Sequence, residues 1–401
     1  MLVIFAQFPD DEWNVSWPEW PKGKAPSYIN EFIDSTVSER SNTGNITQYF
    51  RVMSLGAFTV IGNCYSVIAP HTRQWYDENK KGRAFINKDV IEKLNRTVDF
   101  KPFDNWHFVK GYSQINRPDS LIDMICVVWR NINNEALNLN FTGDFKFTGE
   151  ASLGSDLRNV SFKVDNGIRT VAEGYPGFST QGSGLTVAAG YNGHNLVQQY
   201  TIHELGHYLF GDNRYHIQTG VWGIMAGYGS RSQVVNSYER NRLGWISFIQ
   251  YDKNPSGPIP LDDYVTTGQA LRIAIPGTVP QKYYLIENHQ MISRFDNFDR
   301  TSEGKGIYVL YQAGKYNIDL QFYNAEGRAD WEFDHFAVHP KVGVKVPVFR
   351  KERQDPVPGF FDTQSITFTD PNTKQLRTAP IEAYNENGKD YFEPLFKGRG
   401  R

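Results

Sequence analysis

The sequence predicts an α+β protein with two domains, one over residues 1–247 and the other over residues 248–401. Before Trp245, strand-like apolar runs and helical segments are mixed along the chain. After Trp245, alternating or β-branched runs lie between turns rich in Pro, Gly, Asn and Asp, which is typical of an all-β domain. The chain has 401 residues, 40% of them hydrophobic, and can therefore bury the cores of two domains.

The first domain is predicted to contain both strands and helices. Apolar runs predict strands at residues 1–8, 119–129 and 185–189, the last closing a loop-and-strand region rich in Gly, Ser and Thr. Helices are predicted at residues 25–38 and 90–97. In the second domain, strands are predicted in five segments: residues 270–275, 283–287, 306–312, 342–348 and 365–369.

The segment from Asn195 to Gly211 predicts the central helix of the first domain. It carries His203, Glu204 and His207 in the pattern H-E-x-x-H. Residues four apart lie on one helical face, so both imidazoles can reach one metal ion. Zinc suits paired imidazoles, and a catalytic zinc site takes three protein ligands and leaves one position for water. Glu204 is placed to take a proton from that water.

The third zinc ligand is expected directly after this helix. In the metzincin pattern H-E-x-x-H-x-x-G-x-x-H, a glycine lets the chain turn and bring a third histidine to the metal. Here Phe210 and Asn213 occupy the glycine and histidine positions. We favour His216 as the third ligand, because imidazole binds zinc readily and Gly211 allows a longer turn. Asp212, at the helix end, and the later Glu239 are the alternatives.

A glycine-rich apolar turn follows, from Gly220 to Gly229, with Met225 at its centre. Metzincins place a methionine turn under the metal, and this segment is similar to one. Tyr228 then becomes a candidate hydrogen-bond donor to a tetrahedral oxyanion, although a structural role for this tyrosine is also open. Residues 238–245 predict a short helix.

These motifs, in their order along the chain, resemble those of the immune inhibitor A-like secreted metallopeptidases. They are HELGH at residues 203–207, Trp-Gly-Ile-Met at 222–225 and Arg-Leu-Gly-Trp at 242–245. Further segments are similar to the same family, namely residues 2–10, 48–62, 98–105, 121–129, 283–288 and 304–310. The resemblance extends over about residues 1 to 312, and HELGH is its only highly specific motif.

The resemblance implies a metzincin-like zinc protease domain followed by a β-rich, sandwich-like C-terminal domain. The activity it implies is that of a secreted zinc metalloendopeptidase, which hydrolyses peptide bonds through a metal-activated water with Glu204 as general base. It also implies that a strand near residues 185–189 forms the upper rim of the cleft, where an extended substrate can pair. Phe210 and Asn213 depart from the family pattern and leave the third ligand open.

Two other functions remain as alternatives. One is a non-catalytic adhesion protein that binds glycan or protein on a metalloprotease scaffold. An intact Glu204 argues against it, because a pure binder has no use for a general base. The other is a glycopeptidase of narrow specificity. The turn from Asp296 to Asp299 is a candidate calcium site, although acidic turns are commonly only turns.

Charge and composition argue against nucleic acid and a membrane span as partners. The net charge is −2, with Lys and Arg scattered, which gives no reason to expect nucleic acid. No apolar run is long enough for a membrane span. We expect a monomer acting on a protein or glycoprotein substrate.

We expect the protein to be secreted, with its export signal absent from this sequence. Residues 1–8 lack the basic start and small-residue cleavage site of a signal peptide. Sequons at Asn14, Asn45, Asn95, Asn140 and Asn159 fit an extracellular surface. For Cys64 and Cys126 two alternatives remain open: one disulfide bond or two buried free thiols.

Overall fold

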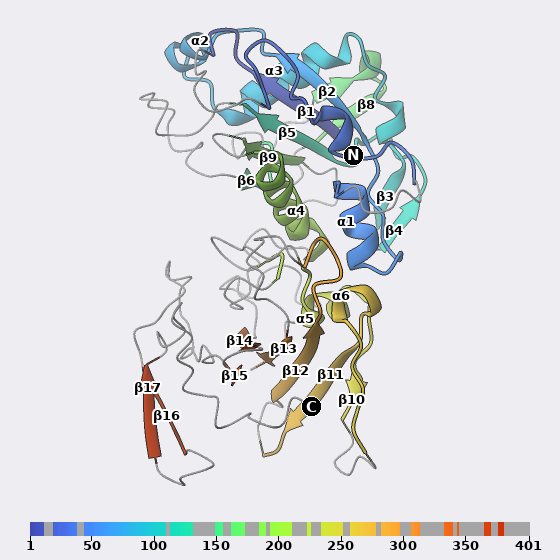
Figure 1. The fold of residues 1–401 in the computed structure, drawn as a ribbon. Coiled ribbons are helices and arrows are strands. Elements are labelled where there is room, and N and C mark those ends of the chain that lie inside the picture. The colour runs from blue at the N-terminus through green and yellow to red at the C-terminus, as the bar shows by residue number, and fades with distance from the viewer. Residues whose placement is uncertain are drawn as a thin grey trace. The chain divides into compact units, whose positions relative to one another are not determined.

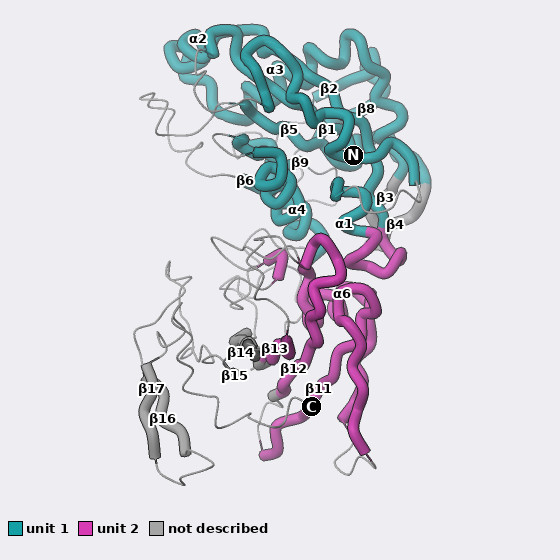
Figure 2. The backbone as a smooth tube through the Cα atoms, viewed as in Figure 1, with its two compact units in different colours: residues 1–50, 59–215 teal, residues 51–58, 216–401 magenta. Residues whose placement is uncertain are grey.

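The computed structural model describes most of the first half of the chain and selected segments of the second. The described residues are 1–11, 19–37, 44–109, 113–130, 149–154, 162–172, 184–189, 193–210, 223–225, 234–251, 257–277, 282–296, 306–312, 333–339, 343–344, 365–369 and 376–380. The chain forms two compact units, one of residues 1–50 and 59–215, the other of residues 51–58 and 216–401 (Figure 2). The structure therefore divides at 215/216, whereas the sequence places the domain boundary at 247/248.

The first unit is built on a five-stranded sheet with the order β2-β1-β5-β9-β6 (Figure 1). Its strands are β1 (Leu2–Gln7), β2 (Asn63–Ile68), β5 (Ile125–Trp129), β6 (Gly149–Glu150) and β9 (Gly184–Ala188). The first three pairings are parallel, and only β6 runs antiparallel, at one edge. Every residue of β1 and of β5 is buried, which fits their continuous apolar sequences, since parallel strands are covered on both faces.

Two helices pack on the two faces of this sheet. On one face, alternate residues of β1 and β5 join a core with Ile86, Val90, Ile91 and Leu94 of α3 (Arg83–Asn95). The other face carries Cys126, whose thiol is hydrogen-bonded to Thr201 of α4 (His194–Phe210). The predicted helix at 90–97 is thus confirmed in type, but it begins earlier. The strand predicted at 119–129 is shorter, because only residues 125–129 pair with β1 and Leu121 forms no more than an isolated bridge with Thr170.

The helix predicted at residues 25–38 is wrong. Only a 3₁₀ turn, η1 (Ile29–Glu31), forms there. Backbone groups of this segment bond to distant parts of the chain: Phe32 C=O accepts from Ile46, Asp34 N–H donates to the Thr47 hydroxyl and Asp34 C=O accepts from Gly62. In addition, Tyr28 and Phe32 contact Phe5 edge-on, with ring centroids 5.7 and 5.1 Å away. Tertiary contacts therefore override local helix propensity.

The remaining elements of the first unit are short, and α1 continues into the second unit. They are α1 (Ile46–Met53), α2 (Arg73–Glu78), η2 (Lys101–Phe103), β3 (Trp106–Val109), β4 (Ser113–Asn116), β7 (Phe162–Val164), η5 (Asp165–Gly167) and β8 (Arg169–Val171). Asn45 precedes α1, is 2% exposed and accepts a hydrogen bond from Gln48 N–H. This sequon therefore caps a helix and is not an accessible glycan acceptor. Among the described helices, none has the length and apolar character of a membrane span.

The two cysteines are free thiols. Cys64 of β2 and Cys126 of β5 both align with Val3 of β1, one on each side. Two strand spacings put them roughly 10 Å apart, beyond the roughly 7 Å that a disulfide can bridge. The choice that the sequence left open is therefore settled by strand order.

The second unit contains a six-stranded sheet in sequence order, antiparallel from β11 onward. Its strands are β10 (Ile249–Gln250), β11 (Ala270–Ile275), β12 (Lys282–His289), β13 (Gly306–Gln312), β14 (Phe333–His339) and β15 (Gly343–Val344). A separate hairpin pairs β16 (Ser365–Thr369) with β17 (Leu376–Pro380). The strands predicted at 270–275, 283–287, 306–312 and 365–369 are confirmed, whereas only 343–344 of the predicted 342–348 forms a strand. Sandwich-like packing stays a prediction.

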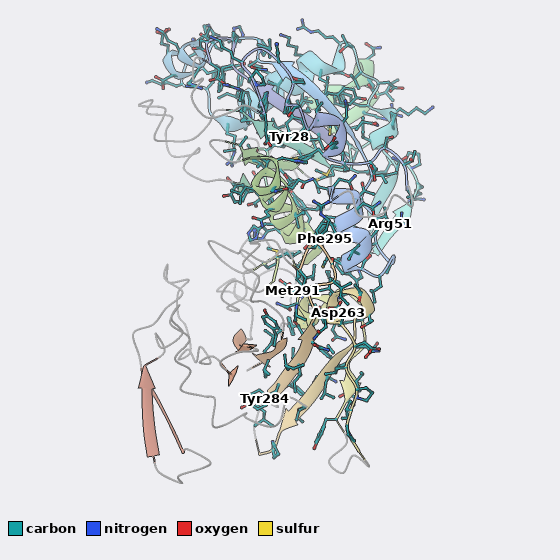
Figure 3. The ribbon with its side chains drawn as sticks, viewed as in Figure 1. Tyr28, Arg51, Asp263, Tyr284, Met291 and Phe295 are labelled. Atoms are coloured by element: carbon teal, nitrogen blue, oxygen red, sulfur yellow. The ribbon has the colours of Figure 1, made fainter. Side chains whose placement is uncertain are left out.

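Two short helices flank the sheet of the second unit, α5 (Ser237–Arg242) and α6 (Tyr264–Thr267). The α6 helix begins at Asp263, labelled in Figure 3, whose carboxylate accepts from Thr266 N–H at 2.9 Å and from Gln290 N–H at 2.8 Å. This one side chain therefore caps the helix and fixes the chain that leaves β12.

A buried ionic group lies at the end of β12. His289 Nδ1 is 2.7 Å from Asp296 Oδ1, and its Nε2 is 2.9 Å from Glu287 Oε2. Burial alone would lower the pKa of His289. The two carboxylates outweigh burial and raise that pKa to about 10. The candidate calcium ligand Asp296 therefore uses one oxygen to bind this imidazolium, and Asp299 lies outside the described residues.

This group predicts a loss of stability at alkaline pH. Because the pKa of His289 is higher in the folded protein than the usual 6.5, its contribution is complete below pH 6.5 and is lost as the pH rises towards about 10. Asp296→Asn should weaken the charge pairing and reduce this dependence. We expect urea unfolding to show a decline on the order of a few kcal/mol in the wild type and a smaller one in Asp296→Asn. Equal declines would contradict the assignment.

Candidate metal centre

The helix α4 presents the H-E-x-x-H residues on a stable, well-covered element. It has 17 residues, close to the predicted 195–211. At its start the Glu19 carboxylate accepts from His194 N–H at 2.9 Å, which binds an otherwise unpaired donor and complements the helix dipole. Buried residues lie along much of its length, including Val197, Thr201 and Leu205. The helix is therefore fixed against the sheet, and its metal-ligand candidates are held by a rigid support.

The imidazoles of His203 and His207 lie at a separation that two ligands of one zinc ion can have. Their ring centroids are 5.1 Å apart and the ring planes are perpendicular. Two imidazoles bound to one tetrahedral zinc through 2.0–2.1 Å bonds have centroids about 5 Å apart. His207 is buried, and His203 is partly exposed. These two residues fit the ion that the sequence predicts.

The third ligand cannot be read from the same region. Within the described ranges, no cluster of three His, Cys, Asp or Glu side chains could hold a metal. The favoured His216 and its rival Asp212 lie outside the described residues, as do Asn213 and Tyr228. Their assignments stay predictions.

The third candidate, Glu239, has a different role. Its Oε1 accepts from Met225 N–H at 3.0 Å, and its Oε2 accepts from Ile224 and Asn236 N–H at 3.2 and 3.0 Å. With the Asn236 side chain it forms a capping box at the start of α5. Glu239 thus fastens the turn that carries Met225 to α5, and both its oxygens are used. This makes it the weakest of the three ligand candidates. An Asn followed three residues later by a Glu is a capping signal visible in the sequence. The prediction of a helix at residues 238–245 did not take this signal into account.

The carboxylate of Glu204 lies beside the paired imidazoles. Its Oε2 is 3.8 Å from His207 Nε2, and the residue is 7% exposed. Burial, followed by the negative charge of Glu150, raises the pKa of Glu204 to about 8, against the opposing effects of the Arg83 guanidinium and the Ala151 N–H. This pKa is that of the metal-free protein, and the positive charge of a zinc ion bound beside Glu204 would lower it.

The structure adds two charged residues that the sequence did not reveal. Arg83, the first residue of α3, is fully buried and forms an ion pair with Glu150 of β6. Both influence the pKa of Glu204. No local pattern marks either residue, because Arg83 and Glu150 meet only when α3 and β6 pack together.

The strand at the sheet edge is not the one expected. The predicted rim strand, residues 185–189, corresponds to β9, which pairs with β5 on one side and with β6 on the other. Both backbone edges of β9 are therefore occupied over the paired residues. The edge next to Glu204 is formed by β6, so the expectation for residues 185–189 is wrong.

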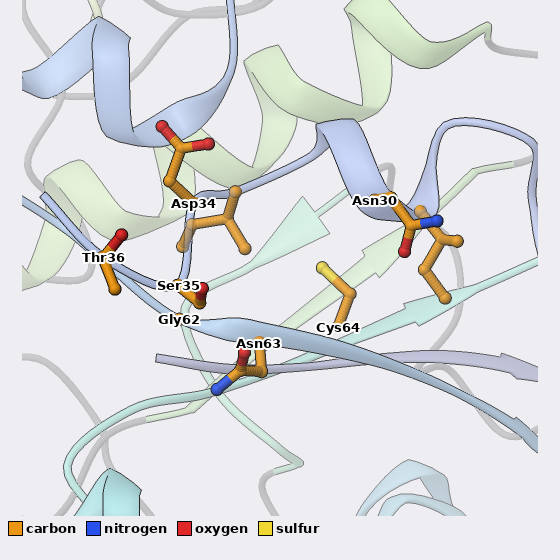
Figure 4. Close-up of a pocket in the computed structure, with 9 residues that line it drawn as sticks. Asn30, Asp34, Ser35, Thr36, Gly62, Asn63 and Cys64 are labelled. Atoms are coloured by element: carbon orange, nitrogen blue, oxygen red, sulfur yellow. The ribbon is translucent and has the colours of Figure 1, made fainter. Parts of the chain in front are cut away.

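A separate polar cavity of about 260 Å³ lies at the start of β2 (Figure 4). It is lined by residues 29, 30, 33–36 and 62–64 and contains none of the H-E-x-x-H residues. Burial raises the pKa of the Cys64 thiol in its wall to about 12, so this thiol stays protonated and is a poor nucleophile. We therefore place the candidate chemistry at α4.

Comparison of the chain with known protein-family models, with curated proteins and with solved structures found no match in any of the three. The resemblance to the immune inhibitor A-like peptidases thus stays a prediction from the motifs.

Proposed function

We propose that this chain is a zinc-dependent endopeptidase in which His203, His207 and His216 bind the metal and Glu204 is the general base. The observation that carries the proposal is the group on α4. Two imidazoles lie at the separation that a shared zinc requires, and a buried carboxylate lies 3.8 Å from one of them.

The chemistry divides between the ion and the chain. When bound, zinc would supply Lewis-acid chemistry, which polarises a scissile carbonyl and acidifies water. Glu204 accepts the proton of the attacking water and delivers it to the leaving amine. Tyr228 is proposed to donate a hydrogen bond to the tetrahedral oxyanion.

The surroundings of Glu204 support this role. Burial raises the proton affinity of its carboxylate, while the Ala151 N–H and the Arg83 guanidinium lower it. In the metal-free protein these effects raise the pKa of Glu204 to about 8. The positive charge of a bound zinc ion would lower this pKa and favour the carboxylate that a general base needs. We also propose protein or glycoprotein substrates and extracellular action. The basis of these two proposals is the motif resemblance alone.

The proposal is tested by metal analysis together with an unbiased peptide library. The purified protein should contain about one zinc per chain and should cleave peptides internally. A chelator should abolish cleavage, and added zinc should restore it. Zinc binding without cleavage of any peptide would favour the adhesion-protein alternative, and absence of zinc would reject the metal centre.

A further inference from the structure

The backbone of the edge strand β6 lies directly against the carboxylate of Glu204. A Cβ atom added at Gly149 would lie 2.5 Å from Glu204 Oε1, 2.8 Å from its Cγ and 3.0 Å from its Cδ. Real Cβ atoms do not approach other atoms so closely, because the repulsive wall of the van der Waals potential is steep. Gly149 is therefore a position where any side chain would displace Glu204.

The residue that follows this strand also holds the carboxylate by a hydrogen bond. The backbone N–H of Ala151, two residues after Gly149, donates to the Glu204 carboxylate. Ala151 is 3% exposed, so this bond is shielded from water. Gly149 and Ala151 together contact Glu204 by close packing and by a directed donor.

The segment that carries these two residues is anchored to α3. Glu150 pairs with the buried guanidinium of Arg83. Further along, Asn87 Nδ2 donates to Leu153 C=O at 2.7 Å, and Gly154 lies so close to Ala84 that an added Cβ would overlap the Ala84 backbone. The position of β6 is therefore fixed from the side opposite to Glu204.

We propose that Gly149 is a positioning residue for the general base: its missing side chain lets β6 lie against Glu204 and hold the carboxylate beside His207. This inference rests on the proposed function. It assigns to Gly149 an effect on turnover that acts through Glu204 and leaves the fold and the zinc ligands intact.

The position tolerates alanine as far as the backbone is concerned. Gly149 is not among the residues with positive φ, so alanine adds no backbone strain. The atom that an added methyl meets first, Glu204 Oε1, is at the end of a flexible side chain. The methyl group also lies 2.8 Å from Glu204 Cγ, so the whole side chain has to turn, and the carboxylate then leaves its place beside His207.

A double-mutant cycle with Glu204→Asp tests the proposal. Gly149→Ala should lower kcat roughly 10- to 100-fold, as expected for a misplaced catalytic group, with KM, zinc content and thermal midpoint nearly unchanged. In the Glu204→Asp background, Gly149→Ala should lower kcat no more than about twofold, because the shorter side chain has already taken the carboxylate out of its place beside His207.

Gly184→Ala is the matched control. Gly184 lies in β9 of the same sheet, and its added Cβ would overlap the Leu153 side chain, with no atom of Glu204 among its nearest neighbours. Any effect of Gly184→Ala should be the same in both backgrounds. An effect of Gly149→Ala that is equally large in both backgrounds, or absent in the active wild type, would overturn the proposal.

A readout in metal-free protein separates this inference from the proposed function. The ¹³C resonance of the Glu204 carboxyl, assigned by its loss in Glu204→Gln, should shift in Gly149→Ala and stay in place in Gly184→Ala. An unchanged resonance in Gly149→Ala overturns the contact itself. If the wild type is inactive but the resonance shifts in Gly149→Ala, the endopeptidase function is overturned and the contact between Gly149 and Glu204 is established.

Discussion

Replacing Glu204 with glutamine should lower kcat about 10²- to 10⁴-fold, the range expected when a general base is lost. Glutamine has nearly the same shape and removes only the proton acceptor. His203 and His207 are untouched, so zinc content should stay the same. Steady-state kinetics on one cleaved peptide, with metal analysis of the same sample, measures both quantities.

The neutral side chain of Glu204→Gln should also remove the cost of burying an ionised carboxylate. Because the pKa of Glu204 is raised to about 8 in the metal-free protein, folding favours its protonated form, and this contribution to stability is lost as the pH rises from about 4.5 to 8. Metal-free Glu204→Gln should therefore lose less stability than the wild type over this range. Glu92→Gln, at a half-exposed site on α3 where the carboxylate pairs with Lys88, is the control for both measurements. Full activity in Glu204→Gln would exclude Glu204 as the base.

Alanine at His203 or His207 should remove zinc, with the affinity falling by orders of magnitude in each single variant. Each change deletes one of two imidazoles whose centroids lie 5.1 Å apart, and the remaining ligands cannot complete the site. The control is His194→Ala at the start of the same helix, where the imidazole stacks on Tyr28 at 4.4 Å. His194→Ala should retain zinc. Full zinc occupancy in the double variant His203→Ala/His207→Ala would reject the centre.

Measuring the zinc affinity of two further variants identifies the third ligand. His216→Ala should weaken zinc binding by orders of magnitude, whereas Asp212→Ala should have a milder effect because Asp212 then only shapes the turn. Loss of zinc in Asp212→Ala with retention in His216→Ala would replace our assignment with two histidines and one carboxylate.

Features with a strong local pattern were predictable from the sequence. The helix α4 has nearly its predicted bounds, and β11 and β16 have the residues predicted for them, because a periodic or β-branched run shows its structure without reference to the rest of the chain. The two imidazoles of the candidate centre were found for the same reason, since a spacing of four residues fixes a helical face.

Features that depend on distant partners were not predictable. The segment 25–38 contains helix-compatible residues, but its backbone bonds to Ile46, Thr47 and Gly62. The importance of Gly149 follows only from its close contact with Glu204 in the folded chain. Arg83 likewise becomes part of the site only through Glu150. Such contacts join residues that are more than ten positions apart, and a single sequence gives no sign of them.

The order of strands in the first sheet has a consequence for the synthesis of the chain. Of the strands in this sheet, β1 is made first, and it lies inside the sheet and takes its partners from residues 63–68 and 125–129. It cannot be enclosed on both sides until the nascent chain has passed residue 129, and α4 follows later still. Parallel pairing across such separations requires long loops to close first, so folding should be slow. Fragments ending before β5 should expose an apolar strand and aggregate.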